Sequence, residues 1–171
     1  MRPSFSSRLL PFSHPEVMHM TTSAAVTLAD LTARTGLDVL AHLEREVTIP
    51  VVAGLQAQGD LIVVPLALLD DVTVPPHTRW TAVPAGGVEL LRGAAGGNPH
   101  TLVADPGTCR WSRRVHDPQR LALGVLDATA VAYLIHPEHG GTGIAPGAYV
   151  IRRQRERSES TGRLGNRFIA D

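Results

Sequence analysis

The chain has 171 residues, 43% of them apolar, so it can bury one hydrophobic core, and its length calls for no second domain. Its 16 basic and 16 acidic residues give a formal net charge of zero, which removes the general attraction to nucleic acid or anionic membranes that a basic protein has. The single cysteine, Cys109, excludes an intramolecular disulfide and favours a cytoplasmic location.

Residues 1–20 form a leader in our interpretation. Their only pair of leucines is followed at once by Pro11, so the continuous apolar segment of a secretory signal peptide is missing. Translation can also begin at Met18, just before a polar stretch. We therefore expect a disordered leader or a wrongly assigned start. No apolar run reaches the roughly 20 residues of a membrane span, so we expect no membrane partner.

Residues 21–50 are predicted to form a helical segment. Leucines between Leu28 and Leu43 recur at intervals of three and four once Gly36 is allowed as a break. The part that ends at Gly36 resembles the first helix and turn of a helix-turn-helix, which makes a nucleic-acid-associated protein one alternative. Acidic side chains dominate the part after Gly36, and their charge disfavours contact with phosphates.

Residues 51–157 are predicted to form a β domain, because short strand-like runs alternate with glycine, proline, aspartate and asparagine. Pro65 cannot donate to a strand ladder, so the first run is expected at a sheet edge or a bulge. The fold class is therefore mainly β, as a single small barrel or sandwich, a cupin-like barrel being one form. A flexible polar tail is expected over residues 158–171. The predicted strands cover residues 61–68, 80–83, 88–91, 100–104, 110–112, 121–126, 129–136 and 148–154.

The candidate metal ligands are His100, His136, His139 and Glu138. Side chains two apart in an extended chain share a face, so His136 and Glu138 point the same way, while His139 enters a Gly-Gly turn and can fold back. Two or three imidazoles with a carboxylate commonly hold a divalent transition metal such as zinc, iron, manganese or nickel. The same residues are also typical of a solvated turn between two strands, so both interpretations stay open.

No catalytic residues are predicted. Nothing in the sequence marks Cys109 as an activated thiolate, and the G-x-S-x-G elbow of serine hydrolases is absent. We therefore expect a non-catalytic binding or assembly module that acts with a protein partner or as a homo-oligomer. A cupin-like metal-binding protein or metalloenzyme is the alternative. Arginines are enriched in protein interfaces, because guanidinium groups pair bidentately with carboxylates. The expected interface residues are therefore Arg152, Arg153, Arg155 and Arg157.

Several motifs in residues 57–157 resemble those of a family of small uncharacterised β proteins from bacteria and their phages. The motifs are Gln-Gly-Asp at 58–60, a Gly-rich loop with a histidine at 93–100, His-Pro-Glu-His at 136–139, Pro-Gly-Ala-Tyr at 146–149 and Gln-Arg-Glu at 154–156. The resemblance implies one compact β domain. It also implies structural roles at the start of the first strand and in the last strand, for Gly59, Asp60, Pro146, Gly147 and Tyr149.

The chain departs from the family pattern at two places. Asn98 stands where the pattern has a histidine, and Arg157 replaces an aromatic residue. The first departure weakens the metal hypothesis, because an amide is a poorer ligand than imidazole for such metals.

Overall fold

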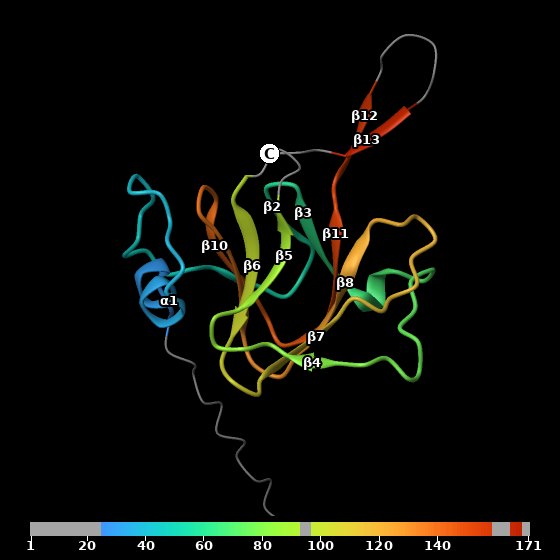
Figure 1. The fold of residues 1–171 in the computed structure, drawn as a ribbon, viewed down its shortest axis with the longest axis horizontal. Coiled ribbons are helices and arrows are strands. Elements are labelled where there is room, and N and C mark those ends of the chain that lie inside the picture. The colour runs from blue at the N-terminus through green and yellow to red at the C-terminus, as the bar shows by residue number, and fades with distance from the viewer. Residues whose placement is uncertain (1–24, 93–96, 159–164, 169–171) are drawn as a thin grey trace, which may run out of the picture.

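The computed structural model describes residues 25–92, 97–158 and 165–168. Two β-sheets face each other and do not close into a barrel (Figure 1). The predicted mainly β fold is therefore confirmed. None of the described helices is long and apolar enough to cross a membrane. The leader predicted over residues 1–20 lies outside the described residues.

The two sheets have different strand orders. The first runs β1-β10-β9-β6-β5 and the second β2-β3-β11-β8-β7-β4. The first sheet consists of β1 (Val51–Val52), β10 (Gly140–Ile144), β9 (Ala132–His136), β6 (Pro99–Ala104) and β5 (Val88–Arg92). The second consists of β2 (Gln56–Gln58), β3 (Leu61–Pro65), β11 (Gly147–Arg153), β8 (Ala122–Ala128), β7 (Cys109–Ser112) and β4 (Thr81–Ala82).

The main core fills the space between the sheets. Leu102 and Leu134 enter it from the first sheet, and Leu126 and Ile151 from the second, all fully buried. Successive side chains of a strand alternate between the two faces, so the residues next to these leucines in β6 and β9 point away from this core. Burial of each of the four core side chains named above stabilises the fold by about 1.5–3 kcal/mol.

A smaller core covers the outer face of the first sheet. Leu28 and Leu31 of α1 (Leu28–Thr35) pack there against Val103 and Tyr133. The helix begins with a capping box, in which the Thr27 side chain accepts from the third helical residue and that residue's carboxylate accepts from the Thr27 N–H. The predicted helix is thus confirmed over its first part.

The helical prediction is wrong beyond Gly36, where the helix ends in the left-handed conformation. Residues 37–50 contain no helix. Their backbone bonds to other parts of the chain instead, since the Leu40 N–H donates to the Pro137 carbonyl and the Ala29 N–H to the Arg45 carbonyl. The helix-turn-helix interpretation therefore lacks its second helix.

Strand β10 was not predicted, because its glycines were assigned to a turn. A Cβ at Gly141 would lie 2.7 Å from the Ile49 side chain, and one at Gly143 would lie 2.9 Å from that of Val51. Contacts this short are not tolerated, so the glycines allow residues 49–51 to lie directly on the strand. The glycine content of β10 therefore reflects close packing by a distant segment.

Every predicted strand overlaps an observed one, with differences at the ends. Pro65 ends β3 and pairs only with Tyr149, because β2 stops opposite Val63. This local edge agrees with the predicted position. Toward the C-terminus, β12 (Arg155–Ser158) pairs with β13 (Gly165–Phe168). A flexible tail was predicted over residues 158–171. Of these residues, 159–164 and 169–171 lie outside the described ones.

Candidate metal site at one end of the sandwich

His100 and His136 face the space between the two sheets. Thr101 of β6 pairs with Ile135 of β9, so the histidines that flank this pair lie opposite each other. Each histidine shares its face with the buried leucine two residues away. Both residues are 2% exposed. The strand register thus brings together two histidines that are far apart in the sequence.

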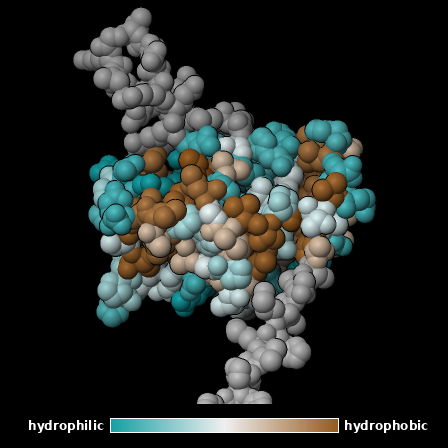
Figure 2. Space-filling view, turned by 180° about the vertical axis from the view of Figure 1, so that it is seen from behind, coloured by the Kyte–Doolittle hydropathy of each residue, from teal (hydrophilic) through white to brown (hydrophobic). Residues whose placement is uncertain are grey.

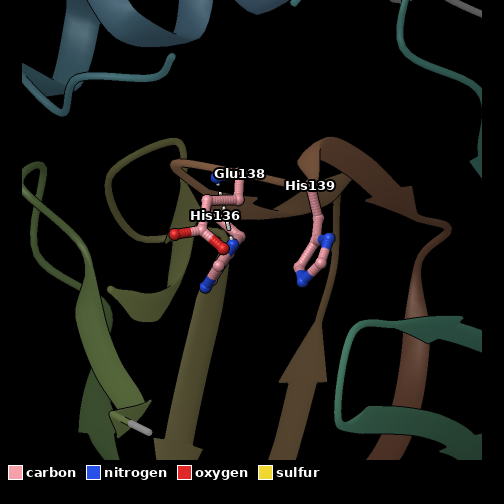
Figure 3. Close-up of side chains that lie close together, drawn as sticks. All are labelled: His136, Glu138 and His139. Carbon is pink, nitrogen blue, oxygen red and sulfur yellow. Dashed lines mark hydrogen bonds between the residues drawn. The ribbon is translucent and has the colours of Figure 1, made fainter. Parts of the chain in front are cut away.

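The turn between β9 and β10 adds His139 and Glu138, both exposed (Figure 3). The ring centroid of His136 lies 4.3 Å from that of His100 and 4.5 Å from that of His139. The His100 and His139 centroids are 6.1 Å apart. All four predicted ligands therefore lie at the same end of the sandwich.

Within the described residues, His136, Glu138 and His139 form a group that could hold a metal ion. Each offers one ligand atom, and these atoms lie within 4.8 Å of one another. Ligands at zinc–nitrogen bond lengths in a tetrahedral site lie about 3.4 Å apart. Because Glu138 and His139 are exposed, small rotations of their side chains can close this difference.

The nitrogens of His100 face other partners. Its Nε2 lies 2.9 Å from Asp60 Oδ1, and its Nδ1 lies 3.3 Å from Gln58 Oε1. The Gln58 amide nitrogen donates to the carbonyls of Leu134 and Gly140, which fixes its oxygen toward His100. His100 Nδ1 must therefore carry a hydrogen. His100 stands beside the ligand group with both nitrogens near oxygens, and its role as a metal ligand stays a prediction.

Both nitrogens of His136 engage the backbone. Its Nε2 lies 3.1 Å from the Asn98 carbonyl oxygen, and its Nδ1 accepts from the Glu138 N–H at 3.2 Å. The Asn98 amide also donates to Glu138 Oε1 at 3.0 Å. Asn98 therefore contacts two members of the group, although the sequence suggested only that it was a missing histidine.

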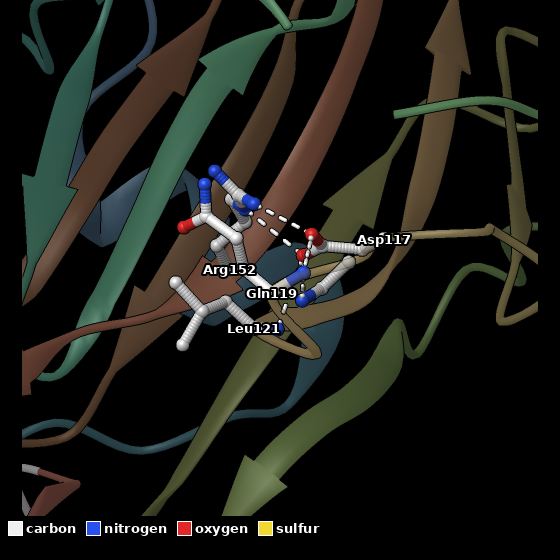
Figure 4. A network of polar contacts seen from close by, with 5 residues as sticks. Asp117, Gln119, Leu121 and Arg152 are labelled. Atoms are coloured by element: carbon white, nitrogen blue, oxygen red, sulfur yellow. Dashed lines mark hydrogen bonds and ion pairs between the residues drawn. The ribbon is translucent and has the colours of Figure 1, made fainter. Parts of the chain in front are cut away.

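The predicted interface arginines have different surroundings. Arg152 is buried, and its guanidinium donates to both carboxylate oxygens of Asp117 (Figure 4). Its charge is thus paired inside the domain, and its assignment to an interface stays a prediction. Arg153 is half-buried, and the side chains of Arg155 and Arg157 lie outside the described ones.

The predicted structural residues lie at turns and in the core. Gly59, with φ 54°, and Asp60 form the tight turn between β2 and β3. Gly147 begins β11 directly after the exposed Pro146, with φ 145°. Tyr149 is buried in the main core. The structural roles that the resemblance implied for these residues stay predictions.

The sequence analysis missed the roles of two buried polar residues. Gln58 was noted only as part of a motif; its spacing of two from Asp60 was the available sign that both side chains could face the same neighbour, His100. Asp117 had no local signal, because its partner Arg152 is 35 residues away in the sequence.

Comparisons with known proteins give one match. No curated protein and no solved structure matches the chain. A family model described as a domain of unknown function (DUF8820) matches residues 57–154. This range covers β3 to β11 and includes every residue of the candidate metal site. The chain therefore belongs to this family of domains of unknown function.

Proposed function

We propose that the protein binds a divalent transition metal through His136, Glu138 and His139. The observation that carries this proposal is the convergence of these three side chains, with ligand atoms within 4.8 Å of one another. The donor set is two imidazoles and one carboxylate, which suits zinc, iron, manganese or nickel.

A metal held by three protein ligands keeps at least one coordination position for water or another small ligand. Next to His139 lies a hollow of about 250 Å³, lined mainly by apolar side chains that include Leu43, Val47 and Ile49. Of the three ligands only His139 lines this hollow, which also borders Leu28 and Ile49 of the smaller core. The proposal is a metal-binding site, with no reaction assigned.

Titration of the chelator-treated full-length protein with Co²⁺ and Zn²⁺ tests the proposal. We expect one metal per chain and visible absorption bands from cobalt bound to nitrogen. The His139→Ala and Glu138→Gln variants should each weaken binding by at least tenfold, because each removes one ligand. Both residues are exposed, so these variants are expected to fold.

His77→Ala is the matched control, because His77 is also exposed, lies in a turn and is not a member of the ligand group. It should bind metal as the unaltered protein does. Dissociation constants in the millimolar range, or equal losses in the His77→Ala and His139→Ala variants, would contradict the proposal.

An assembly module is the second candidate. The large apolar side chains of Val47, Val51 and Leu55 are 60%, 47% and 64% exposed near edge strand β1. Figure 2 shows apolar surface in several patches on one face of the molecule. The β12–β13 hairpin stands apart from the sandwich (Figure 1). Such features favour contact with a protein partner or a second copy.

Light scattering of the full-length chain tests this second candidate. Self-association that Val51→Glu and Leu55→Glu abolish, without loss of thermal stability, would support it. A monomer at all accessible concentrations would remove the homo-oligomer from consideration. A cytoplasmic location and a bacterial or phage origin of the family remain part of this proposal.

A further inference from the structure

Asn98 contacts two of the three proposed metal ligands through different atoms. Its backbone oxygen meets the His136 ring, and its side-chain amide meets the Glu138 carboxylate. The residue lies just before β6 and contacts the end of β9 and the turn that follows it. Asn98 is therefore placed to orient two metal ligands without being a ligand itself.

The backbone contacts of His136 determine which ring nitrogen can meet a metal. A backbone N–H can only donate, so the bond from Glu138 requires His136 Nδ1 to be an acceptor. A neutral imidazole then carries its hydrogen on Nε2, which lies 3.1 Å from the Asn98 carbonyl. Metal-binding histidines commonly donate their second N–H to a carbonyl in this way. In the metal-free protein the Glu138 N–H therefore occupies the Nδ1 lone pair, and a metal would bind Nδ1 in place of this N–H.

The amide of Asn98 acts on the other ligand. An exposed glutamate loses much side-chain freedom when it binds a metal. The bond from Asn98 Nδ2 to Oε1 already restricts Glu138 before any metal binds, and it leaves Oε2 for coordination. The amide thus reduces the ordering that metal binding requires.

We infer that Asn98 is a positioning residue of the proposed metal site, which orients His136 through its carbonyl and Glu138 through its amide. This inference rests on the proposed metal-binding function. It gives the asparagine a role of its own at a position where a histidine would have suggested a direct ligand.

The test compares Asn98→Ala, Asn98→Gln and the control Thr81→Ala, an exposed substitution on the other sheet. Asn98→Ala should weaken Co²⁺ and Zn²⁺ binding by about 10- to 100-fold and alter the cobalt absorption bands. Asn98→Gln keeps an amide and should restore part of the affinity. Thermal unfolding of the metal-free variants should show that all three remain folded.

A second measurement needs no metal. The ¹⁵N shifts of the His136 ring in the metal-free protein should show hydrogen on Nε2 and none on Nδ1. Hydrogen on Nδ1 would overturn the inference whether or not the protein binds metal. Equal metal affinity of Asn98→Ala and the unaltered protein would overturn it while leaving the metal site in place. If the unaltered protein binds no metal, both the inference and the proposed function fail.

Discussion

Two histidines with the same low exposure have ring nitrogens that contact different groups. His100 has an amide oxygen on one side and the Asp60 carboxylate on the other, so both nitrogens lie against oxygens. His136 has the Asn98 carbonyl at Nε2, and its Nδ1 accepts from the Glu138 N–H, a bond that a metal at Nδ1 would replace. Burial alone therefore does not tell a ligand from a hydrogen-bonding residue.

Cys109 is a further buried group whose surroundings decide its reactivity. Burial, with a smaller effect of the Asp127 carboxylate, raises the pKa of the Cys109 thiol from 9.0 to about 11. At pH 8 the thiolate is therefore roughly a hundredfold less abundant than in an exposed cysteine. We expect a disulfide reagent to modify the native protein far more slowly than the denatured protein. Equal rates in the two states would contradict the buried position.

At the scale of one element, Asp117 organises the turn between β7 and β8. Its carboxylate accepts from the backbone N–H groups of Gln119, Leu121 and Ala122 (Figure 4). Arg120 adopts a left-handed conformation, with φ 56°, within this turn. The bidentate bond to Arg152 then ties the turn to β11.

Loss of the Asp117 carboxylate should be costly. Asp117→Ala leaves the buried guanidinium of Arg152 without its partner and should lower the free energy of unfolding by about 3–5 kcal/mol. Asp127→Ala is the matched control, because Asp127 forms an exposed pair with Arg110 and should cost about 1 kcal/mol or less. Denaturant unfolding measures both. Similar losses for the two variants would show that burial does not set the cost.

The same carboxylate should make stability depend on acid. Burial alone would raise the pKa of Asp117, but the bonds from Arg152 and from the backbone outweigh it and hold the pKa below its ordinary value of 3.8. A lowered pKa stabilises the fold above pH 3.8, and this contribution is lost as the pH falls through the native pKa. Unfolding curves between pH 6 and pH 2 should therefore show less acid sensitivity for Asp117→Asn than for the unaltered protein.

At the scale of the whole molecule, Gln58 links the two sheets. It belongs to β2 of the second sheet, and its amide donates to the carbonyls of Leu134 and Gly140 in the first. Its oxygen holds His100 beside Asp60, next to the candidate metal site. One side chain therefore hydrogen-bonds from one sheet to the other beside the candidate metal site.

Removal of this link should weaken the fold and disturb the site. Gln58→Ala leaves His100 Nδ1 and two carbonyls without this partner and should cost about 1–3 kcal/mol. Ala57→Ser, at the exposed neighbouring position, should be close to neutral. Denaturant unfolding gives the stability, and the ring shifts of His100 report its surroundings. Unchanged stability and unchanged shifts in Gln58→Ala would contradict the link.

The sequence by itself determined the parts that depend on local pattern. Alternating apolar residues located the strands that overlap the observed ones, and the spacing around Leu28 and Leu31 located the helix as far as Gly36. It also supplied the candidate ligands, because two histidines and a glutamate share one short turn. These features depend on neighbours a few residues apart, which a pattern can register.

Only the tertiary structure decided the rest. In the folded chain Arg152 pairs with Asp117, and residues 49–51 pack on the glycines of β10. The His100 ring contacts Asp60 and Gln58. Each of these outcomes depends on groups far apart in the sequence, and on the cost of burying a charge or a ring nitrogen without a partner. Local spacing carries no record of those partners, so the chemistry of the site became visible only when the two sheets were brought together.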